Sequence, residues 1–288
     1  MYSNLQNGII IRQANFDDYV PLANFLSFEY FVHRHLDWRT SLDWLGKKPF
    51  LIAEYNHEII ACFAAPNDVV STTWVRVFAC APSFPKEEIW ELLFERALEI
   101  FDSKIKTVGA LGLLNWFVHL IEKTRFRLTQ EIIVLERSDP RTIYDGLGNE
   151  YFIRKLDPED LPDVVKLDEI SFPPLWQMPM ETMRLAYLQS GYSTVIEKDQ
   201  QIIGYQITTD ALSSAHLARI AVRPDIQKKG LAGFLLTDVI NYYQKIGISR
   251  LTVNTQNDNF ASQMLYKKFG FQRLNEQYPV YTFQICED

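Results

Sequence analysis

Hydrophobic and polar positions follow two different periods along the second half of the chain. Short apolar runs between turn residues predict strands at 151–156, 192–198, 201–209, 215–222, 250–255 and 280–286. Apolar positions at helical spacing predict helices at 157–171, 180–190, 231–247 and 259–270. Because the strands alternate only in part with helices, the pattern predicts an α/β fold with a mixed sheet and helices on both faces.

The first half repeats parts of this pattern. "IIIRQANFDDYVPL" (9–22) resembles "YFIRKLDPEDLPDV" (151–164), and "EYNHEIIACFAA" (54–65) resembles "EKDQQIIGYQIT" (197–208). "FACAPSFPKEEIWELLF" (78–94) resembles "IAVRPDIQKKGLAGFLL" (220–236). The pairs keep one order and an offset of 142 or 143 residues, which indicates a duplicated domain.

The join between the copies is expected near residues 137–150, where Pro, Asp, Gly and Asn stand between apolar runs. We therefore expect one domain over residues 1–140 and another over 150–288. A chain of 288 residues with 47% hydrophobic residues is long and apolar enough for two cores.

Charge and cysteine content narrow the function classes. The formal net charge of −7 argues against a nucleic-acid partner, which needs a basic surface. Cys62, Cys80 and Cys286 are far apart and have no metal-ligand spacing, so we expect no metal site and a reducing compartment. The chain shows neither a signal-peptide pattern nor an apolar run of membrane-spanning length. These features predict a cytoplasmic protein without a membrane partner.

The segment "VRPDIQKKGLAGFLL" (222–236) has lysines and glycines where a helix normally begins with a capping residue. The first N–H groups of a helix lack partners, and the helix dipole is positive at this end. Gly230 admits close approach of a ligand, Ala232 and Gly233 keep the first turn slim, and Lys228 and Lys229 add positive charge. The segment predicts a phosphate or pyrophosphate site; the alternative is a solvated basic turn.

The first half provides an internal comparison at the same helix start. Pro85 replaces Gln227, Glu87 replaces Lys229, Glu88 replaces Gly230 and Trp90 replaces Ala232. Carboxylates and an indole in these positions would repel and obstruct a pyrophosphate, so only the second copy is expected to bind an anion.

Two motifs in the second half resemble those of the GNAT superfamily of N-acetyltransferases. The first motif follows a strand and consists of Gln or Arg, two residues of any type, Gly, one residue of any type, and Gly or Ala. Here it appears after the strand "RIAV" as Gln227-Lys228-Lys229-Gly230-Leu231-Ala232. The second appears in "NFASQMLYKKFGF" (259–271) as Asn259, Ser262, Leu265, Tyr266, Gly270 and Phe271. The resemblance covers about residues 151–288. It implies two GNAT-like domains in tandem, with the first motif lost from the N-terminal one.

The resemblance implies acetyl-CoA as the cofactor and transfer to an amine by direct attack in a ternary complex. The pyrophosphate is expected on the N–H groups of Gln227 to Gly233, and the pantetheine arm along the strand that contains Ala221 and Val222. An N–H group near Val222 would hold the thioester carbonyl. Tyr266 would protonate or hydrogen-bond the leaving thiolate, and Asn259 would position the cofactor or the helix start. A core aromatic role is the alternative for Tyr266.

The general base and the acceptor stay open. Thr252 stands where related N-terminal acetyltransferases have a glutamate, so His216, Asp168, Glu169 and water are candidates for the base. Phe172 and Trp176 are expected either to line the acceptor groove or to pack on the sheet. The acceptor partner is a small-molecule amine or a peptide or protein amino group, and the protein is a monomer or homodimer. The rival function is a non-enzymatic acyl-CoA sensor.

Overall fold

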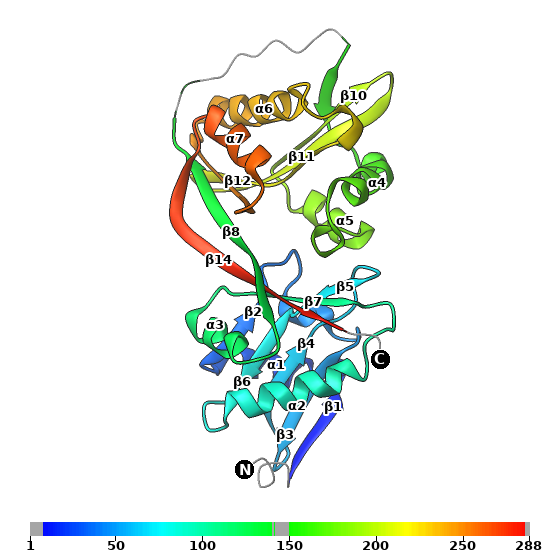
Figure 1. Ribbon diagram of the computed structural model, residues 1–288, viewed down its shortest axis with the longest axis vertical. Coiled ribbons are helices and arrows are strands. Elements are labelled where there is room, and N and C mark those ends of the chain that lie inside the picture. Colours follow the sequence, from blue (N-terminus) through cyan, green and yellow to red (C-terminus); the bar gives the residue numbers. More distant parts are fainter. Residues whose placement is uncertain (1–7, 140, 142–149, 286–288) are drawn as a thin grey trace. The chain divides into compact units, whose positions relative to one another are not determined.

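The computed structural model describes residues 8–139, 141 and 150–285, and the chain divides into two compact units. Unit 1 comprises Met1–Thr129 and Tyr278–Asp288, and unit 2 comprises Gln130–Gln277. Strands β8 (Arg127–Arg137) and β14 (Gln272–Gln284) carry the chain between the units (Figure 1). The last strand therefore ends in unit 1, whereas the sequence had suggested a linear division. Most of the expected join (140 and 142–149) and Cys286 lie outside the described residues.

Unit 2 is built on a mixed sheet, as the sequence predicts. From β8 its strands follow in the spatial order β13 (Arg250–Gln256), β12 (Ser214–Val222), β11 (Gln201–Ala211), β10 (Tyr192–Lys198) and β9 (Phe152–Lys155). β12 and β13 are parallel, and the other neighbouring pairs are antiparallel.

Helices cover both faces of this sheet. On one face, α4 (Leu161–Ser171) packs against β11 and β12, and α5 (Met180–Leu188) packs against α4. On the other face, α6 (Leu231–Lys245) buries Leu235, Leu236, Val239 and Ile240, which recur at helical spacing. The helix α7 (Phe260–Lys268) shares this second core through Tyr266 and the adjoining Phe269. No helix in the described ranges is both long and apolar enough to cross a membrane.

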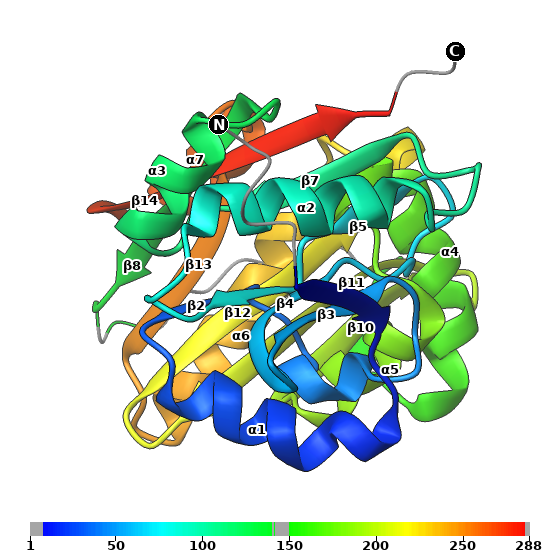
Figure 2. The same ribbon diagram turned by 90° about the horizontal axis from the view of Figure 1, so that it is seen from below.

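Unit 1 contains an antiparallel sheet between two helices. Its strands lie in the order β1 (Ile9–Gln13), β3 (Phe50–Tyr55), β4 (Glu58–Ala64), β6 (Val77–Cys80) and β2 (Phe31–Arg34). Figure 2 shows β3 and β4 between α1 (Tyr19–Phe28) and α2 (Lys86–Leu98). The remaining elements are β5 (Thr72–Trp74), β7 (Thr107–Leu111) and α3 (Asn115–Glu122); β7 pairs with β5 and with the end of β14.

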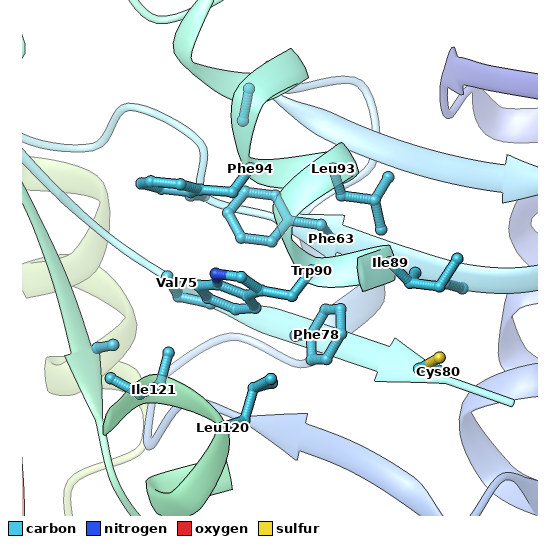
Figure 3. Packing of buried hydrophobic residues seen from close by; sticks show 14 of the residues in the cluster. Phe63, Val75, Phe78, Cys80, Ile89, Trp90, Leu93, Phe94, Leu120 and Ile121 are labelled. Carbon is cyan, nitrogen blue, oxygen red and sulfur yellow. The ribbon is translucent and has the colours of Figure 1, made fainter. Parts of the chain in front are cut away.

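The core beneath α2 is centred on Trp90, whose side chain is fully buried (Figure 3). Its ring lies 5.0 Å from that of Phe78 and 5.5 Å from that of Phe63, both edge to face. Edge-to-face contacts of this kind add to the free energy gained from burial. Trp90 thus serves the core of unit 1, which explains why the first repeat has a large residue where the second has Ala232.

One ion network occurs in both units and supports the duplication. In unit 1, Arg12 lies 2.6 Å from both Asp18 and Glu54. In unit 2, Arg154 lies 2.6 Å from Asp160 and 2.5 Å from Glu197. Asp18 and Asp160 each also accept a main-chain N–H three residues earlier, at 2.8 Å. The networks occupy corresponding places, so the repeat extends from sequence to side-chain geometry.

Candidate active site of unit 2

The two parallel strands of unit 2 separate part-way along their length. β12 pairs with β13 only from Ser214 to Leu217. Immediately afterwards, a register shift against β11 leaves Ala218 without a cross-strand partner, which is a β-bulge. Beyond the bulge β12 continues to Val222 and, among the described residues, pairs with β11 alone. One main-chain edge of residues 219–222 is therefore open.

Strand alternation shows which groups face this open edge. The Arg223 N–H donates to the Ile203 carbonyl at 2.9 Å, on the β11 side. Because main-chain groups alternate in an antiparallel pair, the N–H groups of Ile220 and Val222 point away from β11. Sequence reasoning selected Val222 and missed Ile220. It also selected Ala221, whose N–H lies on the β11 side.

The loop after β12 has an unusual backbone. Lys228 has φ of +65° and Gly230 has φ of +83°, both in the left-handed region. Glycine adopts this region without strain, but lysine rarely occurs there. The Gln227 amide donates to the Val222 carbonyl at 2.9 Å and so ties the loop to the end of the strand. A Cβ on Gly230 would meet only Phe234, at 3.9 Å, so the backbone angle requires glycine here.

This backbone leaves a run of N–H groups without acceptors. Helix α6 begins at Leu231, and its first bond from the loop is from Phe234 N–H to Gly230 O at 3.2 Å. In the described part of the chain, no acceptor is found for the N–H groups of Lys228 to Gly233. A helix N-terminus preceded by left-handed turns concentrates such donors into an anion-binding concavity. The segment has the chemistry that a diphosphate needs.

The side chains of this segment have different surroundings. Those of Gln227, Lys228 and Lys229 are exposed, and Ala232 is half-buried. Leu231 is buried in the core. A Cβ on Gly233 would lie 3.3 Å from the Phe269 ring, so this glycine allows α6 and α7 to pack closely. Leu231 and Gly233 can thus contribute to an anion site only through their main chains.

Neither feature occurs in the described residues of unit 1. Its strand β6 corresponds to residues 219–222, but both of its edges are paired, one with β4 and the other with β2. The helix α2 has Glu87 and Glu88 in its first turn, and Glu87 forms ion pairs with Lys86 and Lys123. Carboxylates at this helix start favour the helix and disfavour an anion.

Tyr266 lies inside the core beside α6. Its side chain is 3% exposed and its ring lies 5.6 Å from that of Phe271. The hydroxyl makes no hydrogen bond to any residue that the structure describes. Burial raises the pKa of this hydroxyl, so it is protonated at neutral pH and able to donate. Asn259 caps α7, because its side-chain oxygen accepts the Ser262 N–H at 3.2 Å.

His216 and Thr252 face each other across β12 and β13. The His216 Nδ1 lies 2.9 Å from the Thr252 hydroxyl oxygen. Both side chains point away from the core beneath α6, since their neighbours Leu217 and Val253 belong to that core. Burial lowers the pKa of His216, so the imidazole is neutral at neutral pH.

Asp168 is occupied by structural contacts. Its carboxylate is fully buried and accepts the Tyr205 hydroxyl at 2.5 Å and the Arg219 Nε at 2.8 Å. The guanidinium of Arg219 lies 3.5 Å from the ring centre of Phe172 and donates to the Trp176 carbonyl at 2.6 Å. Arg219 is therefore held by the ring of Phe172 and the main chain of Trp176. Of the two candidate carboxylates on α4, only that of Glu169 is exposed.

Comparison with a family model decides the relationship. Residues 161–271 match the model described as the acetyltransferase (GNAT) family. The chain therefore contains a GNAT-family domain over these residues. The match includes the open edge, the N–H-rich loop and Tyr266, and the described residues contain no His, Cys, Asp and Glu cluster suited to a metal ion.

Relatives and a solved structure agree with this membership. A Haemophilus ducreyi protein named ribosomal protein bS18-alanine N-acetyltransferase is 38% identical over 88 residues, which cover 31% of this chain and 58% of that protein. A Bacillus subtilis protein, given the same name with a provisional qualifier, is 27% identical over 120 residues, which cover 42% of this chain and 80% of that protein. The match thus spans little more than half of the Haemophilus ducreyi protein.

A tandem GNAT protein from the clavulanic acid biosynthesis pathway matches almost the whole structure. The TM-score is 0.60 at 12% identity, with 97% of this chain and 99% of that chain covered. This likeness concerns the fold. It confirms the expected α/β fold of two GNAT-like domains in tandem.

Proposed function

We propose that unit 2 transfers the acetyl group of acetyl-CoA, its donor substrate, to an amine in a ternary complex. The proposal rests on two features that follow each other directly along the main chain. The open edge of β12, with the N–H groups of Ile220 and Val222, leads directly into the unpartnered N–H groups of Lys228 to Gly233. A single stretch of main chain thus offers donors for an extended polar chain and for an anion at its end.

The residues present fit the donor substrate. The unpartnered N–H groups of Lys228 to Gly233 are called the N–H cradle below. The side chains of Lys228 and Lys229 place positive charge beside this cradle, which favours a diphosphate. At the other end, the N–H of Ile220 is the first donor on the open edge after the bulge at Ala218. An N–H fixed there stabilises negative charge that develops on a thioester oxygen. Unit 1 has carboxylates and a paired strand in the same places, so we propose that it binds no donor.

Proton transfer is assigned to two side chains of unit 2. Tyr266 donates a hydrogen bond or its proton to the departing thiolate, and its raised pKa keeps the hydroxyl protonated before transfer. His216 accepts the proton that the amine loses, since its lowered pKa keeps the imidazole neutral. Thr252 fixes the orientation of the ring through Nδ1. The enzyme needs no protein nucleophile, because placement of two reactants supplies much of the rate.

We propose a peptide or protein N-terminal amine as the acceptor. The named activity of the Haemophilus ducreyi relative is acetylation of an alanine of ribosomal protein bS18. The alternative is a small amine, since a Renibacterium salmoninarum relative named mycothiol acetyltransferase is 31% identical over 90 residues. Thr252, in place of a glutamate, distinguishes this site from that of the N-terminal acetyltransferases that it resembles.

The test is a screen of acetyl-CoA-dependent thiol release. The full chain is incubated with acetyl-CoA and, separately, with peptides that differ in their first residue, with the same peptides blocked at the N-terminus, and with small amines. We expect thiol release with free peptide N-termini and none with blocked ones. Release with small amines alone would move the acceptor to that class. Tight acetyl-CoA binding without release for any amine would favour the sensor function instead.

A further inference from the structure

Asp168, Tyr205 and Arg219 form a buried polar cluster of unit 2, the clamp, on positions that are apolar in unit 1, whose own buried ion pairs involve Arg76 instead. Asp168 accepts from Tyr205 at 2.5 Å and from Arg219 at 2.8 Å and 2.6 Å. Asp168 and Tyr205 are fully buried, and the side chain of Arg219 is 12% exposed. Burying a carboxylate and a guanidinium costs desolvation free energy, which apolar side chains would avoid.

Unit 1 has apolar side chains in these places. The buried residues of α1 are Leu22, Phe25 and Leu26, which correspond to Val164, Leu167 and Asp168 of α4. By the cross-strand registers, Tyr205 corresponds to Cys62 and Arg219 to Val77. Leu26, Cys62 and Val77 belong to one apolar core. The same fold is therefore stable without the clamp, and its presence in unit 2 needs a different explanation.

The explanation lies in the segment that follows the first α-helix of each unit. In unit 1 this segment is β2, which pairs with β6 from Phe31–Cys80 to Arg34–Val77. In unit 2 it is Pro173 to Trp176, which forms a short 3-10 helix (Pro174–Trp176) instead of a strand. Proline has no N–H and cannot donate to a strand ladder, so Pro173 and Pro174 disfavour the pairing seen in unit 1.

The clamp holds this segment through side chains. Arg219 donates to the Trp176 carbonyl at 2.6 Å, and Asp168 accepts the Met178 N–H at 2.8 Å. These bonds approach β12 from its α4 face, because Arg219 points toward Asp168 of that helix. They leave the N–H groups of Ile220 and Val222 unused. The segment is thus fixed beside β12 without blocking the open edge.

We infer that Asp168, Tyr205 and Arg219 are positioning residues. They hold residues 219–222 of β12 apart from β13, in the geometry that binds acetyl-CoA. This inference rests on the proposed function, because the edge that the clamp keeps in place is the one assigned to acetyl-CoA. The clamp need not contact donor or acceptor. It acts through the main chain on which Arg219 and Ile220 are neighbours.

The test compares two tyrosines of the full chain whose hydroxyls each donate to a carboxylate. Tyr205→Phe removes one hydrogen bond from Asp168 and leaves the Arg219 contacts in place. The matched control is Tyr192→Phe, since Tyr192 donates to Asp238 of α6 at 2.9 Å. We expect Tyr205→Phe to raise the CoA dissociation constant, measured by calorimetry, by about threefold or more. The control is expected to bind as the wild type does, even if both variants lose similar thermal stability.

A second variant installs the unit 1 residues as Asp168→Leu with Arg219→Val. Because both charges leave together, no unpaired charge is left buried and the variant is expected to fold, while CoA affinity falls by about tenfold or more. Equal CoA affinity for Tyr205→Phe, Tyr192→Phe and the wild type would overturn the inference, as would a folded double variant that binds CoA within twofold of the wild type. If the double variant does not fold, the comparison of CoA affinity between Tyr205→Phe and Tyr192→Phe decides. Failure of the wild type itself to bind CoA would instead refute the proposed function.

Discussion

His216 Nδ1 lies 2.9 Å from the Thr252 hydroxyl oxygen, across the last part of β12 and β13 where the two strands still pair. Just beyond, the bulge at Ala218 opens the strands. The imidazole is thus fixed next to the start of the open edge, and burial lowers its pKa. His216 is therefore a candidate base whose ring orientation is fixed by a hydrogen bond.

The first prediction concerns the pH dependence of turnover. A base with a lowered pKa loses activity only when the pH falls below that pKa, so kcat is expected to decline with a midpoint below pH 6.5, the ordinary histidine value. His216→Ala is expected to lower kcat by about 10²-fold and to remove this decline. A decline that persists unchanged in His216→Ala would assign the base to another group.

Removal of the Tyr266 hydroxyl tests the acid. Tyr266→Phe is expected to lower kcat by about 10²-fold while the CoA dissociation constant stays unchanged, because only transfer of the proton is lost. Tyr243→Phe is the control, since Tyr243 has a buried hydroxyl that, within the described residues, also lacks a partner. Kinetics and calorimetry on both variants separate the roles, and equal kcat values for the two would return Tyr266 to a packing role.

Two glycines with the same backbone conformation test the N–H cradle. Gly230 and Gly247 have φ of +83° and +84° at opposite ends of α6. Both Gly230→Glu and Gly247→Glu place a side chain on a left-handed backbone, but only the first adds a carboxylate to the cradle. We expect CoA affinity to fall by more than about 100-fold in Gly230→Glu and by less than about threefold in Gly247→Glu. A similar loss in both would point to strain rather than to the site.

Unit 1 is expected to contribute stability through its aromatic core. Trp90→Ala removes the ring at the centre of that core and is expected to lower the free energy of unfolding by about 3–5 kcal/mol, measured in urea. Phe28→Ala serves as the control, since Phe28 is 86% exposed, and its effect is expected to stay within about 0.5 kcal/mol. A small effect of Trp90→Ala would show that the core repacks around the missing ring.

The sequence was most informative where local chemistry determines structure. The apolar periods predicted the order of strands and helices in unit 2, and the loop from Gln227 to Gly230 was recognised from its glycine and lysines. The left-handed Lys228 was not foreseen, because lysine has no preference for that conformation. The role of Gly233 in helix packing depends on Phe269, which is distant in sequence.

Features that depend on strand pairing could not be predicted from the sequence. The bulge at Ala218 and the donor role of Ile220 follow from the register of β12 against β11. The pairing of β2 with β6 likewise connects segments separated by some forty residues. Asp168 was considered as a base because it lies on the first helix of the second half, near the expected acceptor side, whereas Tyr205 and Arg219, on two strands, bury it. Each of these features joins residues that local patterns treat separately.

The central claim is tested most directly by a crystal structure of the full chain with bound CoA. The account predicts one CoA molecule, with its diphosphate on the N–H groups of Lys228 to Gly233 and its pantetheine arm on the Ile220–Val222 edge of β12. A diphosphate bound at the first turn of α2 in unit 1, or a CoA that leaves the β12 edge unoccupied, would contradict it.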